Sequence, residues 1–148
     1  MSVLVNDVHS GLNDTAVDEI VAVDSVGAVR AALERARASG RPTSLAGGRH
    51  AMGGKQFCTG GLLLDTRPLS GVLLLDDERG LVEVEAGIQW PALVDALSDT
   101  PWAIRQKQTG ADRLTLGGAI SANVDGRALT LKPIVADVES VVLVDASG

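Results

Sequence analysis

The chain has 148 residues, of which 45% are hydrophobic and only 2% aromatic, so it can form one ordinary domain with a core of valine, leucine and alanine. Its net charge of −6 and its lack of a basic stripe argue against nucleic acid as a partner. A single cysteine, Cys58, excludes an internal disulfide, and the sequence shows neither a signal-peptide pattern nor a membrane-length apolar run. We therefore expect a soluble cytoplasmic protein that does not bind membranes.

The N-terminal segment, residues 1–18, is polar and poorly periodic, and we expect its His9 side chain to be solvated. A strand is predicted over residues 19–23. A helix is predicted over residues 26–39, because its apolar residues recur at helical spacing. Ser25 is suited to cap the start of this helix, and Gly40 to end it.

A further strand, over residues 43–46, should run parallel to the first and leads into a glycine-rich loop, residues 47–54. Glycine permits positive φ and close approach to a ligand, and consecutive loop amides that point one way form an anion site. The loop therefore favours a phosphate cradle, with a mobile surface loop as the alternative. It is not a Walker A loop, because Arg49 stands at the first glycine position and Gln56 replaces the hydroxyl residue, and its spacing also breaks the dinucleotide-binding fingerprint.

The middle of the chain predicts more strands and a second helix. Strands are expected over residues 61–65 and 72–75, followed by a turn over residues 76–80. Residues 81–86 alternate between small apolar side chains and glutamate, which is typical of a half-buried antiparallel strand. In the helix that follows, the predicted buried face holds four apolar residues: Trp90, Leu93, Val94 and Leu97.

A second glycine-rich region occupies residues 108–127. Its small residues from 117 to 122 suit a short, tightly packed helix with free amides at its start, where Thr115 could supply a hydroxyl. The alternative is a helix whose small residues serve packing alone. Residues 138–145 predict a buried strand that ends in a turn, and such an open sheet edge indicates that the chain is part of something longer.

Three segments in this order resemble the FAD-binding domain of the vanillyl-alcohol oxidase and p-cresol methylhydroxylase flavoprotein family. They are SLAGGRHAMGG at residues 44–54, VEVEAGIQW at residues 82–90 and LTLGGAISANVDGR at residues 114–127. The resemblance implies an α+β, PCMH-type FAD-binding fold of two small α+β subdomains that is incomplete at its C-terminus. It places the first subdomain, with the pyrophosphate loop, at residues 19–66 and the truncated second one at residues 67–148.

By the same resemblance, two sets of residues would bind FAD, and no metal site is implied. The first set would hold the pyrophosphate: Gly47, Gly48, Arg49, His50, Ala51 and Met52. The second set would line the other side of the flavin: Gly110, Thr115, Gly117, Gly118, Ser121 and Asn123.

His50 falls where many members of that family carry a histidine bonded to the flavin 8-methyl carbon, so the resemblance implies a possible covalent link, with a simple hydrogen bond as the alternative. Covalent members usually follow this histidine with serine, whereas here Ala51 follows. A second, cysteinyl link is not expected, because neither Ala111 nor Asp112 is cysteine. Asp125 replaces a frequent histidine and should turn toward a cation such as Arg127.

The resemblance implies the FAD-binding portion of a flavin-dependent oxidoreductase that oxidises an alcohol- or amine-type small molecule, with the substrate domain absent from this chain. Asp112 and Arg113 are possible polar contacts, and no substrate base can be named. One alternative is a non-catalytic truncated remnant, or the partner-binding half of a split flavoprotein that associates with a second chain or itself at the open C-terminal edge. A further alternative is a regulatory module that binds another nucleotide with the same loops.

Overall fold

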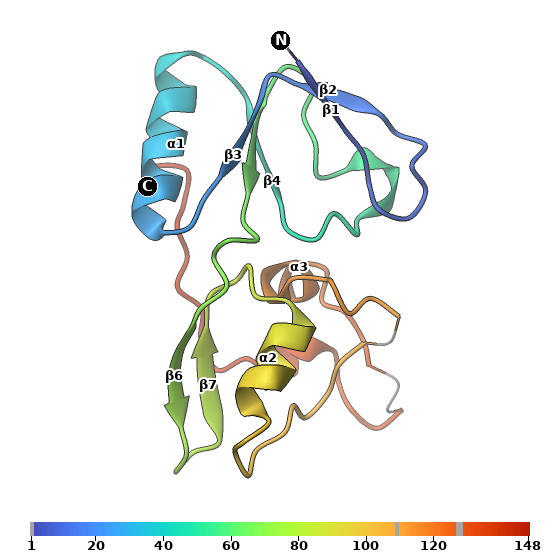
Figure 1. Cartoon of the computed structure of the whole chain (residues 1–148), viewed down its shortest axis with the longest axis vertical. Coiled ribbons are helices and arrows are strands. Elements are labelled where there is room, and N and C mark those ends of the chain that lie inside the picture. Colours follow the sequence, from blue (N-terminus) through green and yellow to red (C-terminus); the bar gives the residue numbers. More distant parts are fainter. Residues whose placement is uncertain (1, 109, 127–128) are drawn as a thin grey trace.

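Three parallel strands, one helix and a separate two-stranded hairpin lie in the upper half of the molecule in Figure 1, which we call the parallel-sheet lobe. The computed structural model describes residues 2–108, 110–126 and 129–148. Strand β5 (Leu62–Asp65) lies between β3 (Glu19–Ala22) and β4 (Thr43–Ala46), and both neighbours run parallel to it. The two strands of the predicted strand–helix–strand unit are therefore parallel but not adjacent.

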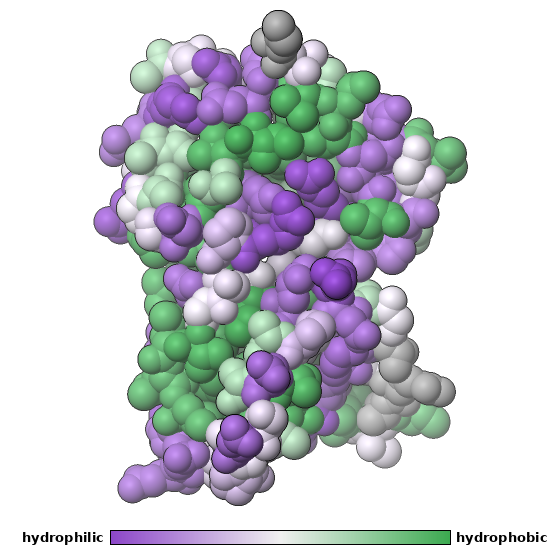
Figure 2. Space-filling model, viewed as in Figure 1, coloured by the Kyte–Doolittle hydropathy of each residue, from purple (hydrophilic) through white to green (hydrophobic). Residues whose placement is uncertain are grey.

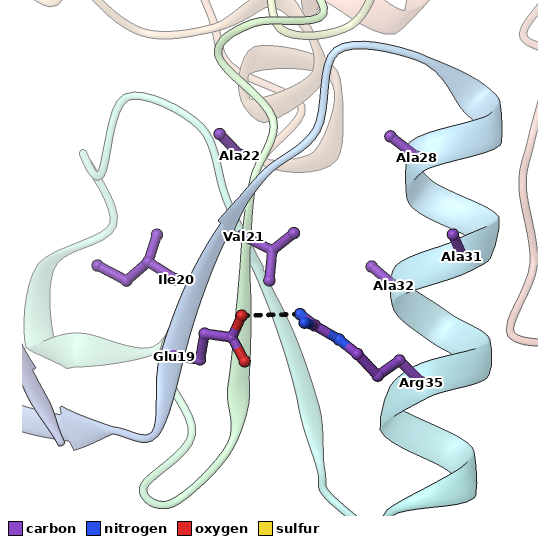
Figure 3. Close-up of a pocket in the computed structure, with 8 residues that line it drawn as sticks. All are labelled: Glu19, Ile20, Val21, Ala22, Ala28, Ala31, Ala32 and Arg35. Carbon is purple, nitrogen blue, oxygen red and sulfur yellow. Dashed lines mark hydrogen bonds and ion pairs between the residues drawn. The ribbon is translucent and has the colours of Figure 1, made fainter. Parts of the chain in front are cut away.

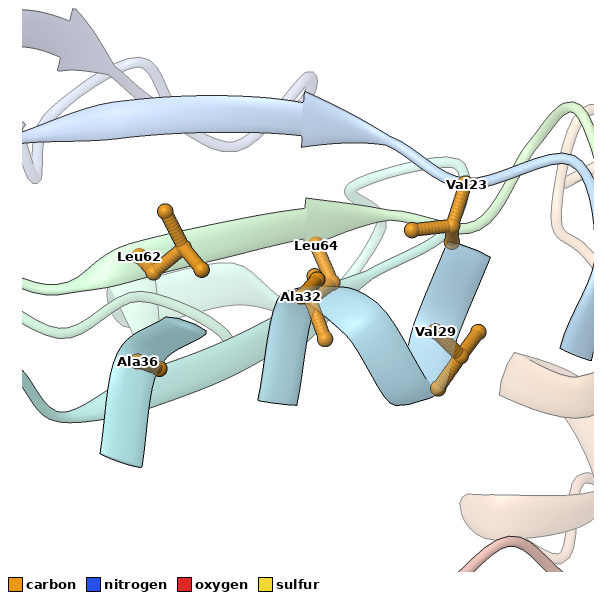
Figure 4. Close-up of a cluster of buried hydrophobic side chains, with 6 residues drawn as sticks. All are labelled: Val23, Val29, Ala32, Ala36, Leu62 and Leu64. Carbon is orange, nitrogen blue, oxygen red and sulfur yellow. The ribbon is translucent and has the colours of Figure 1, made fainter. Parts of the chain in front are cut away.

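Strand β5 is buried on both faces, because Leu62, Leu63 and Leu64 are each at most 1% exposed. The side chains of Leu62 and Leu64 meet helix α1 (Val26–Ala38), as Figure 4 shows. Leu63 points to the opposite face. There it packs with residues of a hairpin made of β1 (Val3–Val5) and β2 (Thr15–Val17).

The start of α1 follows the sequence pattern closely. The Ser25 hydroxyl accepts a hydrogen bond from the Ala28 amide at 3.1 Å, so the predicted cap is confirmed. At the other end, Gly40 has a φ of 63°, a left-handed conformation that glycine adopts without strain.

The lower half of Figure 1, which we call the hairpin lobe, begins with the antiparallel pair β6 (Val72–Asp76) and β7 (Leu81–Val84). Helices α2 (Trp90–Leu97) and α3 (Leu116–Ser121) pack beside this pair. Two 3₁₀ turns complete the elements: η1 (Met52–Gly54) in the parallel-sheet lobe and η2 (Ile134–Asp137) in the hairpin lobe. The hairpin lobe has a core of its own, formed by six buried residues: Ile88, Trp90, Leu93, Leu97, Ala119 and Ile134.

Two sequence-based predictions about apolar residues are wrong. Val94 is 51% exposed, because only Trp90, Leu93 and Leu97 of α2 face the core. The buried strand predicted over residues 138–145 does not form, and the exposed fractions of its Val141, Val142 and Leu143 lie between 66% and 91%. A strand needs a hydrogen-bonding neighbour, and none of the described strands pairs with this segment. The predicted open sheet edge after it is therefore not seen.

No helix in the described parts of the chain combines the length and the apolar character that crossing a membrane requires.

Candidate functional site

The two glycine-rich regions meet where the two lobes touch. We call residues 47–54, which follow β4, the glycine loop, and residues 110–115, which precede α3, the threonine loop. A Cβ atom built on Gly47 would lie 2.2 Å from the Thr115 hydroxyl oxygen. A Cβ atom built on Gly48 would lie 2.2 Å from the Arg113 carbonyl oxygen. Since real Cβ atoms do not approach other atoms so closely, only glycine allows this contact between the loops.

Hydrogen bonds join the threonine loop and the start of α3 to residues 86–89 of the hairpin lobe. The Leu116 amide donates to the Ile88 carbonyl at 2.8 Å, and the Gly117 amide donates to the Ala86 carbonyl at 2.7 Å. The Gln89 side-chain amide donates to the Arg113 carbonyl at 2.5 Å, which aims that carbonyl toward the glycine loop. Residues 86–89 of the resembling segment at residues 82–90 therefore support the loop that meets Gly48.

Thr115 links the loop contact to helix α3. Its side chain is 2% exposed, and its hydroxyl accepts a hydrogen bond from the Gly118 amide at 3.3 Å, so it caps the helix. The predicted hydroxyl of Thr115 at the start of α3 is confirmed. The prediction of free amides there is wrong, because the amides of Leu116, Gly117 and Gly118 donate to Ile88, Ala86 and Thr115. The same hydroxyl forms the surface against which Gly47 packs.

The glycine loop presents a run of backbone amides without protein acceptors. In the described parts of the chain, no turn or loop hydrogen bond between backbone groups uses the amides of residues 47–51 as donors. Arg49, in the middle of this run, has a φ of 58°, which is rare for a residue with a side chain. Alternating backbone conformations of this kind turn successive amides to one side and create an anion site.

Arg49 adds an unpartnered cationic group to the same loop. Its Nε atom is buried and has no hydrogen-bond partner among the described residues. Its guanidinium carbon lies 6.0 Å from the centre of the Phe57 ring. A buried N–H without a partner is costly, and a bound anion would remove that cost.

Asp65, at the end of β5, is a buried carboxylate that sequence analysis missed. It is 6% exposed, and the Arg67 Nε atom donates to both of its oxygens at 2.9 and 3.1 Å. Burial alone would raise the pKa of Asp65, but the hydrogen bonds and charge of Arg67, helped by the charge of Arg49, hold that pKa below its ordinary value. The signal in the sequence is an aspartate that directly follows a run of three leucines.

His50 does not stand alone, and the prediction for His9 is wrong. The Nδ1 atom of His50 lies 2.9 Å from the Nε2 atom of His9, and the ring centres are 4.9 Å apart. His9 is exposed but paired, rather than simply solvated. Burial lowers the pKa of His50 and the charge of His9 lowers it further, whereas the Arg113 carbonyl acts in the opposite direction. The lowered pKa favours the neutral form of the His50 ring.

The structure separates the second predicted set of residues. Thr115, Gly117 and Gly118 lie at the start of α3, where Thr115 faces the glycine loop, Gly117 packs on Ala86 and Gly118 packs on Thr115. Ser121 and Asn123 lie at the other end of that helix, where the Asn123 side chain accepts a hydrogen bond from the Val135 amide at 3.4 Å. Gly110 has a φ of 83° and an open surrounding.

The remaining predicted polar contacts have structural partners or lie apart. Asp112 forms an ion pair with Lys107. Asp125 is exposed, and its expected partner Arg127 lies outside the described residues. Met52 is 63% exposed on η1.

A separate groove of about 490 Å³ lies between β3 and α1, as Figure 3 shows. Alanine and aliphatic side chains line most of it, and an ion pair between Glu19 and Arg35, 2.9 Å long, crosses it. It contains none of the residues of the two loops.

Comparison with known proteins agrees with this geometry. A family model described as an FAD binding domain matches residues 17–148. A search of curated protein sequences found no match. Among solved structures, an alkyldihydroxyacetonephosphate synthase is similar with a TM-score of 0.69 and 21% identity, over 78% of this chain and 22% of that chain. A second crystal form of that enzyme matches with a TM-score of 0.69 and 22% identity, over 80% of this chain and 25% of that one.

An aclacinomycin oxidoreductase is also similar, with a TM-score of 0.66 and 20% identity, over 78% of this chain and 23% of that chain. At these identities the likeness concerns the fold. The chain spans about a quarter of the length of each of these solved proteins.

Proposed function

Because the chain belongs to the FAD-binding domain family and its cofactor is FAD, we propose that it is the flavin-holding portion of an oxidoreductase that oxidises an alcohol- or amine-type substrate. FAD supplies the redox chemistry in such enzymes by accepting a hydride from a substrate carbon. The share of this chain would be to bind the cofactor, orient it and exclude water from it. The observation that carries the proposal is the glycine loop, with its unpartnered amides, packed against the threonine loop.

The residues present fit the diphosphate of FAD. The amides of residues 47–51 would donate to its oxygens, and the buried Nε atom of Arg49 would find an acceptor there. An acidic protein with a net charge of −6 does not attract an anion through its overall field, so these local donors must provide the affinity. Thr115 would keep its present role of closing the loop contact.

His50 would lie at the rim of this site, and we keep the covalent flavin link through His50 as part of the proposal. Covalent attachment needs a ring nitrogen with a free lone pair. In the structure Nδ1 already faces His9, and the Arg113 carbonyl also interacts with the ring. A ring nitrogen of His50 must lose its present contact before it can bond to the flavin. We expect FAD to bind first and to displace that contact.

The visible absorption spectrum of the purified chain, native and after acid precipitation, tests the proposal. Flavin bands in the native protein support binding, and bands that stay with the precipitate support the covalent link. A colourless protein that does not quench the fluorescence of added FAD would refute binding by this chain. Competition between inorganic diphosphate and FAD would support the glycine loop as the part of the chain that binds the diphosphate of FAD.

A second candidate function is the binding of a partner chain without catalysis. It is favoured by exposed apolar side chains on β6, where Val72, Leu73 and Leu74 are 41%, 59% and 57% exposed. Figure 2 shows apolar surface gathered over this part of the hairpin lobe. A colourless chain that elutes as a stable dimer in gel filtration would support this function, whereas a yellow monomer would contradict it.

A further inference from the structure

One neighbour of the His50 ring, His9, comes from a segment outside the family match. His9 lies in the turn between β1 and β2, whereas the match begins at residue 17. Its Nε2 atom is 2.9 Å from Nδ1 of His50, with the ring planes tilted by 59°. Nothing in the FAD-binding match therefore accounts for this pair.

The turn that carries His9 is held rigidly. The carboxylate of Asp7 accepts hydrogen bonds from the amides of His9 at 3.0 Å and Ser10 at 2.6 Å, and from the Ser10 hydroxyl at 2.7 Å. These bonds, led by the Ser10 hydroxyl, lower the pKa of Asp7 to about 2, so the carboxylate is ionised at neutral pH. Charge-assisted bonds of this kind are stronger than neutral ones.

The same turn is also attached to the glycine loop. The Val8 amide donates to the Arg49 carbonyl at 3.0 Å, one residue before His50. A Cβ atom on Gly54, at the far end of the loop, would lie 3.3 Å from the Asn13 side chain. The hairpin of β1 and β2 thus contacts both ends of the loop that carries His50.

The chemistry of the neighbours decides which nitrogen of His50 carries the proton. A neutral imidazole has one N–H donor and one acceptor nitrogen. The Arg113 carbonyl can only accept. It and the Cδ2 atom of His50, which is bonded to Nε2, both lie within 2.8 Å of the Cβ position built on Gly48, and the carbonyl acts on His50 as an acceptor that raises its pKa. A proton on Nε2 lies on this side of the ring and leaves Nδ1 of His50 to accept from the Nε2–H of His9.

We propose that His9 is a positioning residue for His50: it donates its Nε2 proton to Nδ1 of His50, fixes the Nε2–H tautomer and holds the ring between the glycine loop and the threonine loop. The ring is thereby presented in one neutral form and one orientation. The positioning of His50 by His9 does not depend on the proposed function. Only its consequence, that the positioned ring faces the bound flavin, rests on that function.

Nitrogen NMR of protein labelled with ¹⁵N-histidine tests this directly, at pH about 8, where the lowered pKa of His50 leaves its ring neutral. The expected wild-type spectrum shows His50 with a protonated Nε2 and an unprotonated Nδ1. In His9→Ala the two nitrogen shifts should move toward each other, because the tautomers then exchange. In His9→Gln the side-chain amide can still donate, so the shifts should return toward the wild-type values.

Leu12→Ala is the matched control, because Leu12 lies in the same turn and is 83% exposed. Its spectrum should equal that of the wild type. Averaged His50 shifts in the wild-type protein, the opposite tautomer, or shifts in His9→Ala identical to the wild type would each overturn the proposal. The wild-type spectrum decides even where a variant does not fold.

Titration with FAD separates this inference from the proposed function. His9→Ala should weaken FAD binding by about 2- to 12-fold, the share of one hydrogen bond, while Leu12→Ala should leave it unchanged. A fixed His50 tautomer in a wild-type chain that does not bind FAD would refute the proposed function and leave the positioning role standing. FAD binding by a wild-type chain whose His50 tautomers are averaged would refute the positioning role of His9 and leave the proposed function standing.

Discussion

The contact between the two loops should be sensitive to a single methyl group at Gly47 or Gly48. Neither glycine has a positive φ, so alanine meets no backbone strain there and the effect comes from the contact alone. The new Cβ atom would lie 2.2 Å from the Thr115 hydroxyl in Gly47→Ala and 2.2 Å from the Arg113 carbonyl in Gly48→Ala. An ordinary contact needs about 1 Å more, so one loop must move away.

Overpacking of this kind costs about 1–3 kcal/mol of unfolding free energy. The two variants should differ in how they can be rescued. Thr115→Ala removes the hydroxyl and methyl groups that face Gly47, whereas no side-chain change removes the backbone carbonyl that faces Gly48. Gly47→Ala should therefore cost less in a Thr115→Ala background than in the wild type, and Gly48→Ala should cost the same in both.

Urea denaturation of the three single and two double variants gives this coupling as two double-mutant cycles. The cycles are needed because Thr115→Ala alone should cost about 1 kcal/mol through the loss of the α3 cap. Gly27→Ala is the matched control: Gly27 lies in α1, and its nearest neighbour is the Ser25 hydroxyl at 3.9 Å. This variant should be neutral or stabilising by up to about 1 kcal/mol.

The reasoning is refuted if Gly47→Ala and Gly48→Ala unfold like Gly27→Ala, or if Thr115→Ala rescues Gly48→Ala as well as it rescues Gly47→Ala. The loops would then not touch as the structure shows. FAD titration of the folded variants adds a second reading, since a displaced glycine loop should weaken binding in the two loop variants and leave Gly27→Ala unchanged.

Three further changes test the packing and the charges of the parallel-sheet lobe. Leu64→Ala should lower the unfolding free energy by about 2–5 kcal/mol in urea denaturation, because Leu64 is fully buried against α1. In the wild type the lowered pKa of Asp65 stabilises the fold above pH about 4, and this stabilisation is lost as the pH falls below it. In Arg67→Ala the effect of burial dominates, so the pKa of Asp65 should rise. Carbon NMR measures this pKa, and a value that is still lowered in the variant would contradict the role of Arg67. Asp7→Asn should remove the stabilisation that the wild type loses between pH about 4 and about 2, and an unchanged acid-unfolding curve would count against it.

The elements that could be predicted from the sequence are those whose apolar pattern is local. Helix α1 and the hairpin of β6 and β7 follow from periodicity, a serine cap and a polar turn, and they form within about two residues of the predicted bounds. The prediction for Val94 is wrong because α2 buries a narrow face, and a residue next to Leu93 in sequence lies about 100° around the helix. The predicted strand over residues 138–145 is wrong because a strand depends on a partner elsewhere in the chain.

The site could be predicted only in part, for a similar reason. The glycine loop was predicted from its glycines and Thr115 from its place before a helix of small residues. The resemblance to known segments added FAD as the ligand, but neither source gave the contact between the two loops. The pairing of His9 with His50 had no such source: a histidine in a polar segment shows no periodicity, and 40 residues separate the two in the sequence. Only the hairpin of β1 and β2, which packs on the outer face of β5, brings them together.

Several glycines in this fold allow close packing within the chain, in addition to any contact with a ligand. A Cβ atom on Gly87 would lie 1.8 Å from the Thr66 carbonyl, and one on Gly117 would lie 2.9 Å from the Ala86 carbonyl. Gly48, Gly87 and Gly117 let the chain pack directly on neighbouring backbone, whereas Gly47 packs on the Thr115 side chain. Among the described residues, the glycine loop is held by these contacts and by the hydrogen bond from the Val8 amide to the Arg49 carbonyl, and no turn or loop hydrogen bond between backbone groups uses the amides of residues 47–51 as donors. An anion that binds those amides would therefore bind a cradle whose shape is set before it arrives.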